Sequence, residues 1–368
     1  MDFNFWKGRQ VLLTGHTGFK GSMLGLWLAD LGANVTGLAL EPPTDPSLFK
    51  LARVGNVLRS IIGDVRHAAA INQTMQETRP EVVFHLAAQP LVRHSYRQPV
   101  ETYSTNVMGT VNVLEAVRHV GSVRACVVVT SDKCYENQEW LWGYRENEPL
   151  GGVDPYSSSK ACAEIVTAAY RHSYFHPARW LEHHTGLASA RAGNVIGGGD
   201  FAQDRLVPDL FRAFGDGKPA VIRRPEASRP WQHVLDPLAG YLLLAQRLNA
   251  NGPAFAQAWN FGPAGVGTCS VLTLAKMIAA RWGQDAAISV DTAFSPEHEA
   301  HDLRLDSTRA RNLLGWQPRW DIKRAVQESV AWHQALKAGA DMHDFTLQQI
   351  HAYQADIVQG RPVAERIL

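Results

Sequence analysis

The sequence has little that would indicate a secreted, membrane-bound or metal-binding protein. Only four cysteines occur in 368 residues, and none has the CxxC spacing of a zinc ribbon or a thioredoxin-like motif. No stretch approaches the roughly 18 uninterrupted apolar residues of a membrane helix, and the N-terminus lacks an apolar segment of signal-peptide length. We therefore expect a cytoplasmic protein with reduced thiols and no membrane contact.

An excess of charge of one sign is also absent. The 36 Lys and Arg residues almost balance the 35 Asp and Glu residues, which leaves a net charge of +1. Nucleic-acid-binding proteins normally have a basic surplus or stripe, so we expect no nucleic-acid partner, although a local basic pocket for a phosphorylated small molecule is compatible with this balance. The 15 histidines, including His85, His183 and His184, show no convincing metal-ligand pattern, and we expect no metal.

The first 130 residues alternate regularly between two patterns. The short apolar, β-branched runs are 11–14, 34–40, 60–62, 81–85 and 125–131, and the helix-length segments between them are 20–31, 68–77 and 100–120. Alternating strands and helices predict parallel βαβ units. We therefore predict an α/β protein, with a Rossmann-type doubly wound parallel sheet and a smaller C-terminal substrate-binding lobe.

The second half of the chain has a less regular sequence pattern than the first. A helix predicted at 155–175 and a strand at 187–191 continue the alternation, whereas glycines and prolines interrupt the segments that follow. We predict a dinucleotide-binding domain over 1–192 and a substrate-binding lobe formed mainly by 193–368. The chain is expected to return to the first domain near 231–261.

A glycine-rich loop follows the first predicted strand. Gly15, Gly18 and Gly21 form a GxxGxxG pattern between this strand and the start of a helix. Such glycines permit a tight turn, close approach of a pyrophosphate and close packing of the helix, and the anion binds at the helix N-terminus. The order of strand, loop and helix favours a dinucleotide site over a glycine-rich turn without a ligand. The other loop residues assigned to this site are Thr17, Phe19 and Lys20.

An acidic residue, Glu41, follows the second predicted strand, 20 residues after Gly21. A carboxylate at this place accepts hydrogen bonds from the adenosine ribose and repels a 2′-phosphate, which favours NAD over NADP; the alternative is a solvated loop carboxylate. Asp64, after the third predicted strand, is a candidate partner of the adenine amino group. The remaining residues assigned to the cofactor site are Val65, Leu86, Ala87, Ala88 and Asn106.

A second motif, YxxxK, begins the helix predicted at 155–175. Tyr156 and Lys160 are four residues apart and share one face of a helix. A lysine ammonium and a cationic nicotinamide near the phenol lower a tyrosine pKa, so we expect Tyr156 to be a base for a hydroxyl proton and both residues to contact the cofactor. Ser131 ends the fifth predicted strand and is their expected partner, because ligands bind at the carboxyl ends of parallel strands.

Together, the glycine loop, Ser131, Tyr156 and Lys160 resemble the extended short-chain dehydrogenase/reductase family. Epimerases of that family usually have small residues after the serine, whereas this chain has the ionisable pair Asp132-Lys133. Such a pair resembles the nucleotide-sugar 4,6-dehydratases, and its Asp-Lys version is similar to the CDP-glucose 4,6-dehydratases. Further matching stretches are 84–93, 103–109, 143–149, 191–200 and 229–234.

The resemblance implies an NAD-dependent lyase that acts on CDP-glucose. Tyr156 would remove the 4-hydroxyl proton as hydride passes to NAD, Lys133 would take the C5 proton, and Asp132 would protonate the departing 6-hydroxyl before hydride returns to C6. The product would be CDP-4-keto-6-deoxyglucose, a precursor of deoxysugars in surface polysaccharides such as O-antigen. Guanidinium groups suit the diphosphate of such a substrate. The candidate substrate-binding residues are Gln89, Arg93, Asn194, Arg205, Arg229 and Arg304.

Several alternatives stay open on the sequence alone. Asp132 could cap a turn after a strand, and Lys133 could stay charged and pair with Asp132 or a phosphate. The family also includes 4-epimerases and dehydratases of GDP-mannose or dTDP-glucose, and a non-catalytic NAD-bound scaffold is a further alternative. By analogy with the family, helices at 100–120 and 155–175 are expected to pair in a homodimer or homotetramer.

Overall fold

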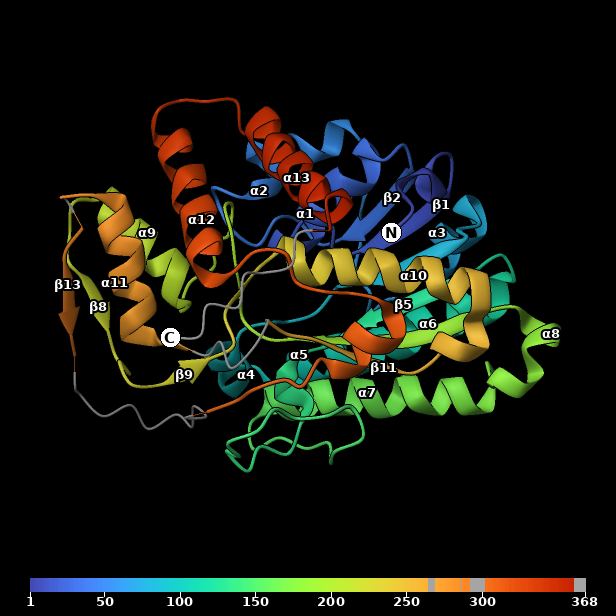
Figure 1. Cartoon of the computed structure of the whole chain (residues 1–368). Helices are drawn as coiled ribbons and strands as arrows, with labels where there is room; N and C mark the ends of the chain where they lie inside the picture. The colour runs from blue at the N-terminus through green and yellow to red at the C-terminus, as the bar shows by residue number, and fades with distance from the viewer. Residues whose placement is uncertain (264–268, 285, 292–301, 361–368) are drawn as a thin grey trace.

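A parallel sheet of seven strands forms the centre of the protein, shown as a computed structural model in Figure 1. The structure describes residues 1–263, 269–284, 286–291 and 302–360. The strand order is β11-β6-β5-β4-β1-β2-β3, and each neighbouring pair is parallel. This order confirms the predicted doubly wound fold. The strands are β1 (Gln10–Thr14), β2 (Asn34–Ala39), β3 (Arg59–Ile62), β4 (Val82–His85), β5 (Ala125–Val129), β6 (Gly186–Ala192) and β11 (Ala258–Phe261).

Helices cover both faces of the sheet. Successive side chains of a strand point to opposite faces, so Leu13 of β1 joins the apolar cluster beneath α1 and α10, whereas Leu12 joins the cluster beneath α3 and α6. Strands covered on both sides read as continuous apolar runs, which explains the pattern in the sequence. The helices of the first face are α1 (Phe19–Asp30), α10 (Leu235–Phe255) and α13 (Met342–Val358), and those of the second are α3 (Ala68–Thr78), α6 (Gly109–Val120) and α7 (Pro155–Ser173).

The helix predicted over 100–120 is divided into three parts. Proline at the first helical position begins α5 (Pro99–Tyr103), as proline's fixed φ angle favours. A π-helical turn follows at Ser104–Met108, and α6 continues from Gly109. Asn106 lies in the π-helical turn and is only 2% exposed.

The smaller lobe has an apolar core of its own. Leu210 and Phe214 of α9 belong to one cluster with Leu274 and Ile278 of α11 and Val330 of α12. The strand pair β8–β13 lies at the outer edge of this lobe (Figure 1). The elements of the lobe are α9 (Leu206–Gly215), β8 (Ala220–Ile222), β9 (Ser228–Arg229), β12 (Cys269–Ser270), α11 (Val271–Trp282), β13 (Ile288–Val290) and α12 (Ile322–Lys337).

Segments from the second half of the chain also contact the sheet and its helices. Helix α10 packs on β5 and β6, and β11 pairs with β6 at the edge of the sheet. Near α13, Asp341 pairs with Arg53 at 2.8 Å and His351 pairs with Asp30 at 2.9 Å, which ties this helix to α1 and its neighbours. The division into 1–192 and 193–368 stays a prediction.

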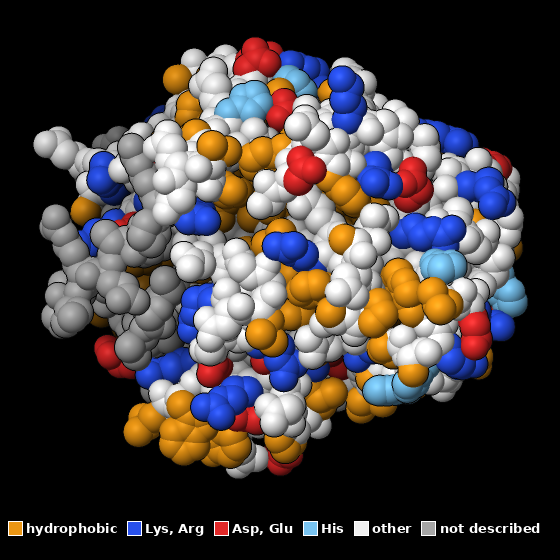
Figure 2. Space-filling model, turned by 45° about the vertical axis from the view of Figure 1, so that its right-hand side comes forward, with side chains coloured by type: hydrophobic (Ala, Val, Ile, Leu, Met, Phe, Trp, Pro, Cys, Tyr) orange, Lys and Arg blue, Asp and Glu red, His pale blue; other side chains and the backbone are white. Residues whose placement is uncertain are grey.

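The surface is mixed in charge. Lys and Arg side chains are interspersed with Asp and Glu on the face in Figure 2, in keeping with the net charge of +1.

Within the described ranges, no helix has both the length and the hydrophobicity that crossing a bilayer requires. The short connecting elements are α2 (Leu48–Leu51), α4 (Val92–Arg97), α8 (Trp180–His183), β7 (Val195–Ile196) and β10 (Gln232–His233).

Candidate active site

The glycine loop joins β1 to α1 and leaves room for an anion. Gly15 has φ +79°, and a Cβ on it would lie 2.8 Å from the Ala87 nitrogen, while a Cβ on Gly21 would lie 2.0 Å from the Gly15 oxygen. Gly18 is the N-cap of α1 and supplies no side-chain acceptor, so the first-turn N–H groups are open to an anionic ligand. The loop residues therefore fit the pyrophosphate of a dinucleotide.

Two acidic residues lie at the ends of β2 and β3. Glu41 is exposed beside Leu40, whose carbonyl accepts a 2.8 Å hydrogen bond from the Thr17 hydroxyl of the glycine loop. Asp64 accepts hydrogen bonds from the backbone and guanidinium of Arg66, at 2.8 and 2.7 Å. Burial alone would raise the pKa of Asp64, but these bonds outweigh it and lower the pKa. Both residues are in place for the predicted adenosine contacts, which stay predictions.

A buried carboxyl group directly follows β5. The Ser131 hydroxyl donates to Asp132 Oδ1 at 2.9 Å and accepts from the Lys133 nitrogen at 3.2 Å, so Ser131 caps the turn Asp132–Cys134. Asp132 is 1% exposed, and its Oδ2 has no hydrogen-bond partner among the described residues. Burial raises the pKa of Asp132, against the lowering effects of Lys133 and Arg229. A raised pKa brings a carboxyl group closer to the range in which it can act as a proton donor.

Helix α7 presents Tyr156 and Lys160 beside this carboxyl group. Its N-cap, Asp154, accepts from the Ser157 nitrogen at 2.9 Å, which places Tyr156 in the first turn and Lys160 one turn later. Burial raises the pKa of Tyr156 to about 12, although the Ser131 hydroxyl opposes this. Burial also lowers the pKa of Lys160 to about 8. In the protein without cofactor, desolvation of the phenol dominates its pKa, and the predicted lowering by Lys160 together with the nicotinamide cation stays a prediction.

One cleft of about 1,240 Å³ joins most of the predicted residues. It lies at the carboxyl ends of the sheet strands and extends to the smaller lobe, where ligands bind in doubly wound proteins. The predicted residues that line it are Gly15, Thr17, Gly18, Phe19, Lys20, Gly21, Glu41, Asp64, Val65, Leu86, Ala87, Ala88, Arg93, Ser131, Asp132, Lys133, Tyr156, Lys160, Asn194, Arg205 and Arg229.

Three predicted residues do not line this cleft. The Asn106 amide accepts from the Gln89 nitrogen at 2.8 Å and donates to the Ser159 hydroxyl at 2.8 Å, so it joins the segment after β4 to α7. The Gln89 side chain donates to Thr102 at 2.9 Å. Arg304 pairs with the neighbouring Asp302 at 2.9 Å. Their polar groups are used inside the protein, and the ligand contacts predicted for them lack support from this geometry.

Basic residues gather at the lobe side of the cleft. Arg229 is 5% exposed and donates to the Ser228 carbonyl at 2.8 Å. Arg205 pairs with Asp200 at 3.2 Å. Asp204 is 3.4 Å from both Arg93 and Arg223. Cations of this density suit a ligand with phosphate groups.

Two arginines that line the cleft were not predicted from the sequence. Arg223 and Arg224 both line the cleft. They are adjacent in the sequence and precede Pro225, in a segment that was treated only as an irregular part of the lobe. The adjacent pair of arginines was the signal that could have revealed them.

The chain matches a known family over most of its length. The family model described as GDP-mannose 4,6 dehydratase matches residues 12–329. The chain belongs to this dehydratase family. The matched range includes the glycine loop, the turn after β5 and the start of α7.

Relatives of this family member include both dehydratases and epimerases. A CDP-glucose 4,6-dehydratase from Salmonella typhimurium is 52% identical over 355 residues, which cover 96% of this chain and 99% of the relative. A UDP-glucose 4-epimerase from Mycolicibacterium smegmatis is 28% identical, over 87% of this chain and 97% of the relative. The structure of a dTDP-glucose 4,6-dehydratase from Bacillus anthracis in complex with NAD has a TM-score of 0.75 at 20% identity, covering 91% of this chain and 100% of that chain. This likeness shows a shared fold.

A buried ion pair links the elements that carry the site residues of this dehydratase-family chain. Glu164, one turn after Lys160 on α7, lies 2.7 Å from Arg191 of β6. Glu164 also accepts hydrogen bonds from the hydroxyls of Thr130 and Ser189, and Thr130 directly precedes Ser131 in the sequence. The pair therefore joins the end of β5, β6 and α7 at the point where the reactive side chains begin.

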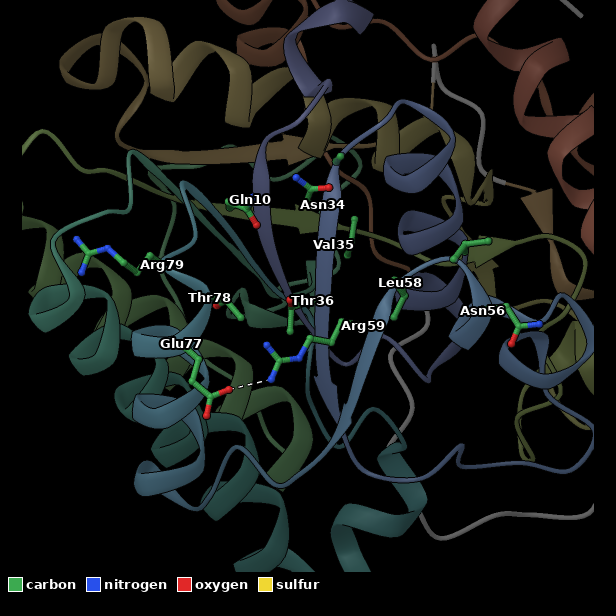
Figure 3. Close-up of a pocket in the computed structure, with 12 residues that line it drawn as sticks. Gln10, Asn34, Val35, Thr36, Asn56, Leu58, Arg59, Glu77, Thr78 and Arg79 are labelled. Carbon is green, nitrogen blue, oxygen red and sulfur yellow. Dashed lines mark hydrogen bonds and ion pairs between the residues drawn. The ribbon is translucent and has the colours of Figure 1, made fainter.

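A second hollow lies away from these residues. It is lined by parts of β2, the start of β3 and the end of α3, with Arg59 and Glu77 paired at 2.8 Å across it (Figure 3). None of the predicted site residues lines it. The predicted site residues that line a cavity therefore all belong to the larger cleft.

Proposed function

We propose that the protein is an NAD-dependent CDP-glucose 4,6-dehydratase, which converts CDP-D-glucose to CDP-4-keto-6-deoxy-D-glucose and water. The observation that carries this proposal is the buried Asp132 carboxyl group, followed by Lys133 and facing the same cleft as Tyr156 and Lys160. An epimerase needs no acid and base for the loss of water, so this pair favours a dehydratase. The 52% identity to the Salmonella typhimurium protein supports CDP-glucose as the nucleotide sugar.

The cleft fits NAD. The uncapped first turn of α1 and the cradle formed by Gly15, Gly21 and Ala87 suit the pyrophosphate, and the exposed Glu41 suits the adenosine ribose of NAD rather than the phosphorylated ribose of NADP. When bound, NAD supplies a hydride acceptor for C4, a hydride donor for C6 and a positive charge near Tyr156, so that the overall reaction is redox-neutral. The rest of the chemistry falls to the side chains of the protein.

Each side chain then has one task. Tyr156 takes the proton of the 4-hydroxyl, with Ser131 and Lys160 beside it to stabilise the phenolate. The resulting C4 ketone acidifies the C5 proton, which Lys133 removes in its neutral form. As the C5–C6 double bond forms and the C6–O6 bond breaks, Asp132 gives its proton to O6, which leaves as water. The raised pKa of Asp132 suits this role as general acid.

The finer biological setting is also part of the proposal. A cytoplasmic homodimer or homotetramer that produces precursors of deoxysugars for O-antigen agrees with the proposed product. Exposed apolar residues on the helices that were expected to pair support self-association: Val100 is 77% exposed, Met108 52% and Ile165 55%. Burying such residues against a second copy would remove apolar surface from water.

A product assay with four substrates tests the proposed function. Purified protein is incubated separately with CDP-glucose, dTDP-glucose, GDP-mannose and UDP-glucose, and the products are identified by mass spectrometry and NMR. We expect loss of water and a 4-keto-6-deoxy product with CDP-glucose at the highest kcat/KM. Preferential dehydration of another nucleotide sugar would contradict the assigned base, formation of a 4-epimer would contradict the dehydratase, and the absence of any turnover would favour a scaffold.

A conservative change at Arg229 tests the diphosphate site. The buried guanidinium offers a planar fork that a lysine cannot reproduce, so Arg229→Lys should raise KM for CDP-glucose although the charge is kept. Loss of one charge-assisted hydrogen bond, about 1.5–3 kcal/mol, corresponds to roughly a 10–150-fold weaker affinity, which we expect for Arg229→Ala. Steady-state kinetics measure both variants. The control is Arg281→Lys, at an exposed position of α11. Unchanged KM and kcat in Arg229→Ala would remove Arg229 from the site.

A further inference from the structure

The turn that carries Asp132 and Lys133 is attached at both ends to one buried ion pair. The pair consists of Glu164 on α7 and Arg191 on β6, which are 2% and 3% exposed and lie 2.7 Å apart. Burial alone would raise the pKa of Glu164, but Arg191 and the surrounding hydroxyl groups outweigh it and lower the pKa. Apolar side chains of similar volume are often as stabilising as a buried ion pair, so stability alone is a weak explanation for this pair.

The first attachment lies at the start of the turn. The hydroxyl of Thr130, the residue before Ser131, donates to Glu164 Oε1. The other carboxylate oxygen, Oε2, accepts from Arg191 and from the Ser189 hydroxyl, each at 2.7 Å. Both oxygens are therefore engaged, and the side chain at the end of β5 is tied to α7. Thr130 is 6% exposed, so water competes little for this bond.

The second attachment lies at the other end of the turn. Arg191 Nη1 donates to the Tyr135 hydroxyl at 2.7 Å, and this hydroxyl donates to Asn260 Oδ1 of β11 at 2.8 Å. The Arg191 guanidinium also lies 4.9 Å from the centre of the Tyr135 ring. Tyr135 lines the cleft, but its hydroxyl is engaged by these two bonds. The guanidinium therefore uses one nitrogen for Glu164 and the other for the turn.

The carboxyl group between these attachments has little room to move. Asp132 Oδ2 lies 3.0 Å from the position that a Cβ would take on Gly193, the residue directly after β6. The carboxyl group thus fits into space that the missing side chain leaves open. Within the turn, the Tyr135 nitrogen donates to the Asp132 carbonyl at 3.4 Å, so a shift of Tyr135 is passed on to Asp132.

The reactive end of α7 is held by contacts that do not involve the ion pair. The Tyr156 nitrogen donates to the Ser95 hydroxyl at 3.2 Å, and the Ser159 hydroxyl accepts from the Asn106 amide at 2.8 Å. Tyr156 and Lys160 therefore keep their supports when the pair is broken. The turn after β5, in contrast, loses the partners of its two ends.

We propose that Glu164 and Arg191 are positioning residues, which hold the turn after β5 so that its acid and base meet O6 and the C5 proton of the sugar. This inference rests on the proposed function. Neither of the two is among the residues that line the cleft, so both act through the groups they bind. Because a misplacement of about 1 Å can cost roughly 100-fold in rate, breaking the pair should slow the loss of water more than the oxidation at C4.

Single-turnover measurements on Glu164→Gln test this role. The amide keeps the shape of the side chain and removes the charge that holds Arg191. CDP-glucose is mixed with holoenzyme, enzyme-bound NADH is followed by its absorbance, and water loss is followed by quenched-flow mass spectrometry. We expect NAD content, KM and the rate of oxidation at C4 near those of wild type. Water loss should be about 10- to 100-fold slower, so that enzyme-bound NADH accumulates.

The two attachments are tested separately by removing one hydroxyl at a time. Thr130→Val keeps the branched shape and Tyr135→Phe keeps the ring, and both should slow water loss as Glu164→Gln does. Thr130→Ser retains the hydroxyl and should restore the wild-type rate. The matched controls are Thr167→Val, whose buried hydroxyl bonds within α7, and Tyr170→Phe, whose hydroxyl bonds to α6. Both controls should behave as wild type.

Other results contradict the positioning role. Wild-type water loss in Glu164→Gln overturns it, and so does a rise in KM alone or an equal slowing of NADH formation and water loss. If Glu164→Gln does not fold, Thr130→Val and Tyr135→Phe are judged by the same criteria. Wild-type enzyme that fails to dehydrate CDP-glucose overturns the proposed function and this inference with it, whereas normal wild-type turnover confines a failure to the positioning role.

Discussion

Replacing Tyr156 by phenylalanine is expected to lower kcat for CDP-glucose by about 10²–10⁴-fold, the usual contribution of one positioned acid or base. The change removes the oxygen that takes the 4-hydroxyl proton and leaves the ring and its packing in place. Because Tyr156 is 8% exposed and its hydroxyl faces Ser131, the variant should fold and retain NAD. Stopped-flow and steady-state assays of CDP-glucose turnover, with NAD content measured after denaturation, test this expectation.

The control for this prediction lies directly after the same helix. Tyr174 follows α7 and is 46% exposed, so Tyr174→Phe should leave kcat and KM unchanged. Activity of Tyr156→Phe within a factor of a few of wild type would exclude the phenol as the base. In that case the high pKa of Tyr156, which burial raises to about 12, would describe a structural tyrosine.

Lys133→Met is expected to stop the reaction after oxidation at C4. A lysine with its ordinary pKa of about 10.4 is protonated at neutral pH and is no base. To act as the base, Lys133 must therefore lose its proton when the bound substrate withdraws it from water. The thioether keeps much of the length of the side chain but cannot accept the C5 proton. Turnover should fall by about 10²–10⁴-fold, and exchange of the C5 hydrogen with deuterated solvent, followed by NMR, should be lost.

The exchange experiment distinguishes a base from a lysine that only holds its neighbours. If Lys133 merely pairs with Asp132 or a phosphate, Lys133→Met should weaken substrate binding and yet exchange C5 hydrogen at a near-normal rate once substrate is bound. Near-normal exchange and turnover would show that another group or water is the base. Lys276→Met, on the exposed side of α11, controls for the loss of a lysine charge.

Local patterns in the sequence were sufficient to predict the fold and the positions of its motifs. Apolar strands alternating with helices specified a doubly wound sheet, because a strand covered on both faces has to be apolar throughout. The glycines of the loop were informative because Gly15 and Gly21 occupy backbone positions that leave no space for a Cβ. The four-residue spacing of Tyr156 and Lys160 placed both on one face of α7, since spacing along a helix is a local property.

Arrangement within the cleft depended on segments that are distant in the sequence. Asn106 turned toward Gln89 and Ser159, and Arg304 turned toward Asp302, so residues of suitable chemistry were used for internal bonds. The pair Glu164 and Arg191 links α7 to β6, a contact that no local pattern specifies.

The sequence by itself therefore determined the family and the order of the elements, and it singled out Ser131, Asp132, Tyr156 and Lys160 as the proposed reactive groups. Only the tertiary structure decided the surroundings of these groups: it buries Asp132 and Tyr156 and raises both pKa values. The physical reason is that desolvation and charge–charge interactions depend on which groups surround a side chain in space, and those neighbours come from strands, loops and helices far apart along the chain.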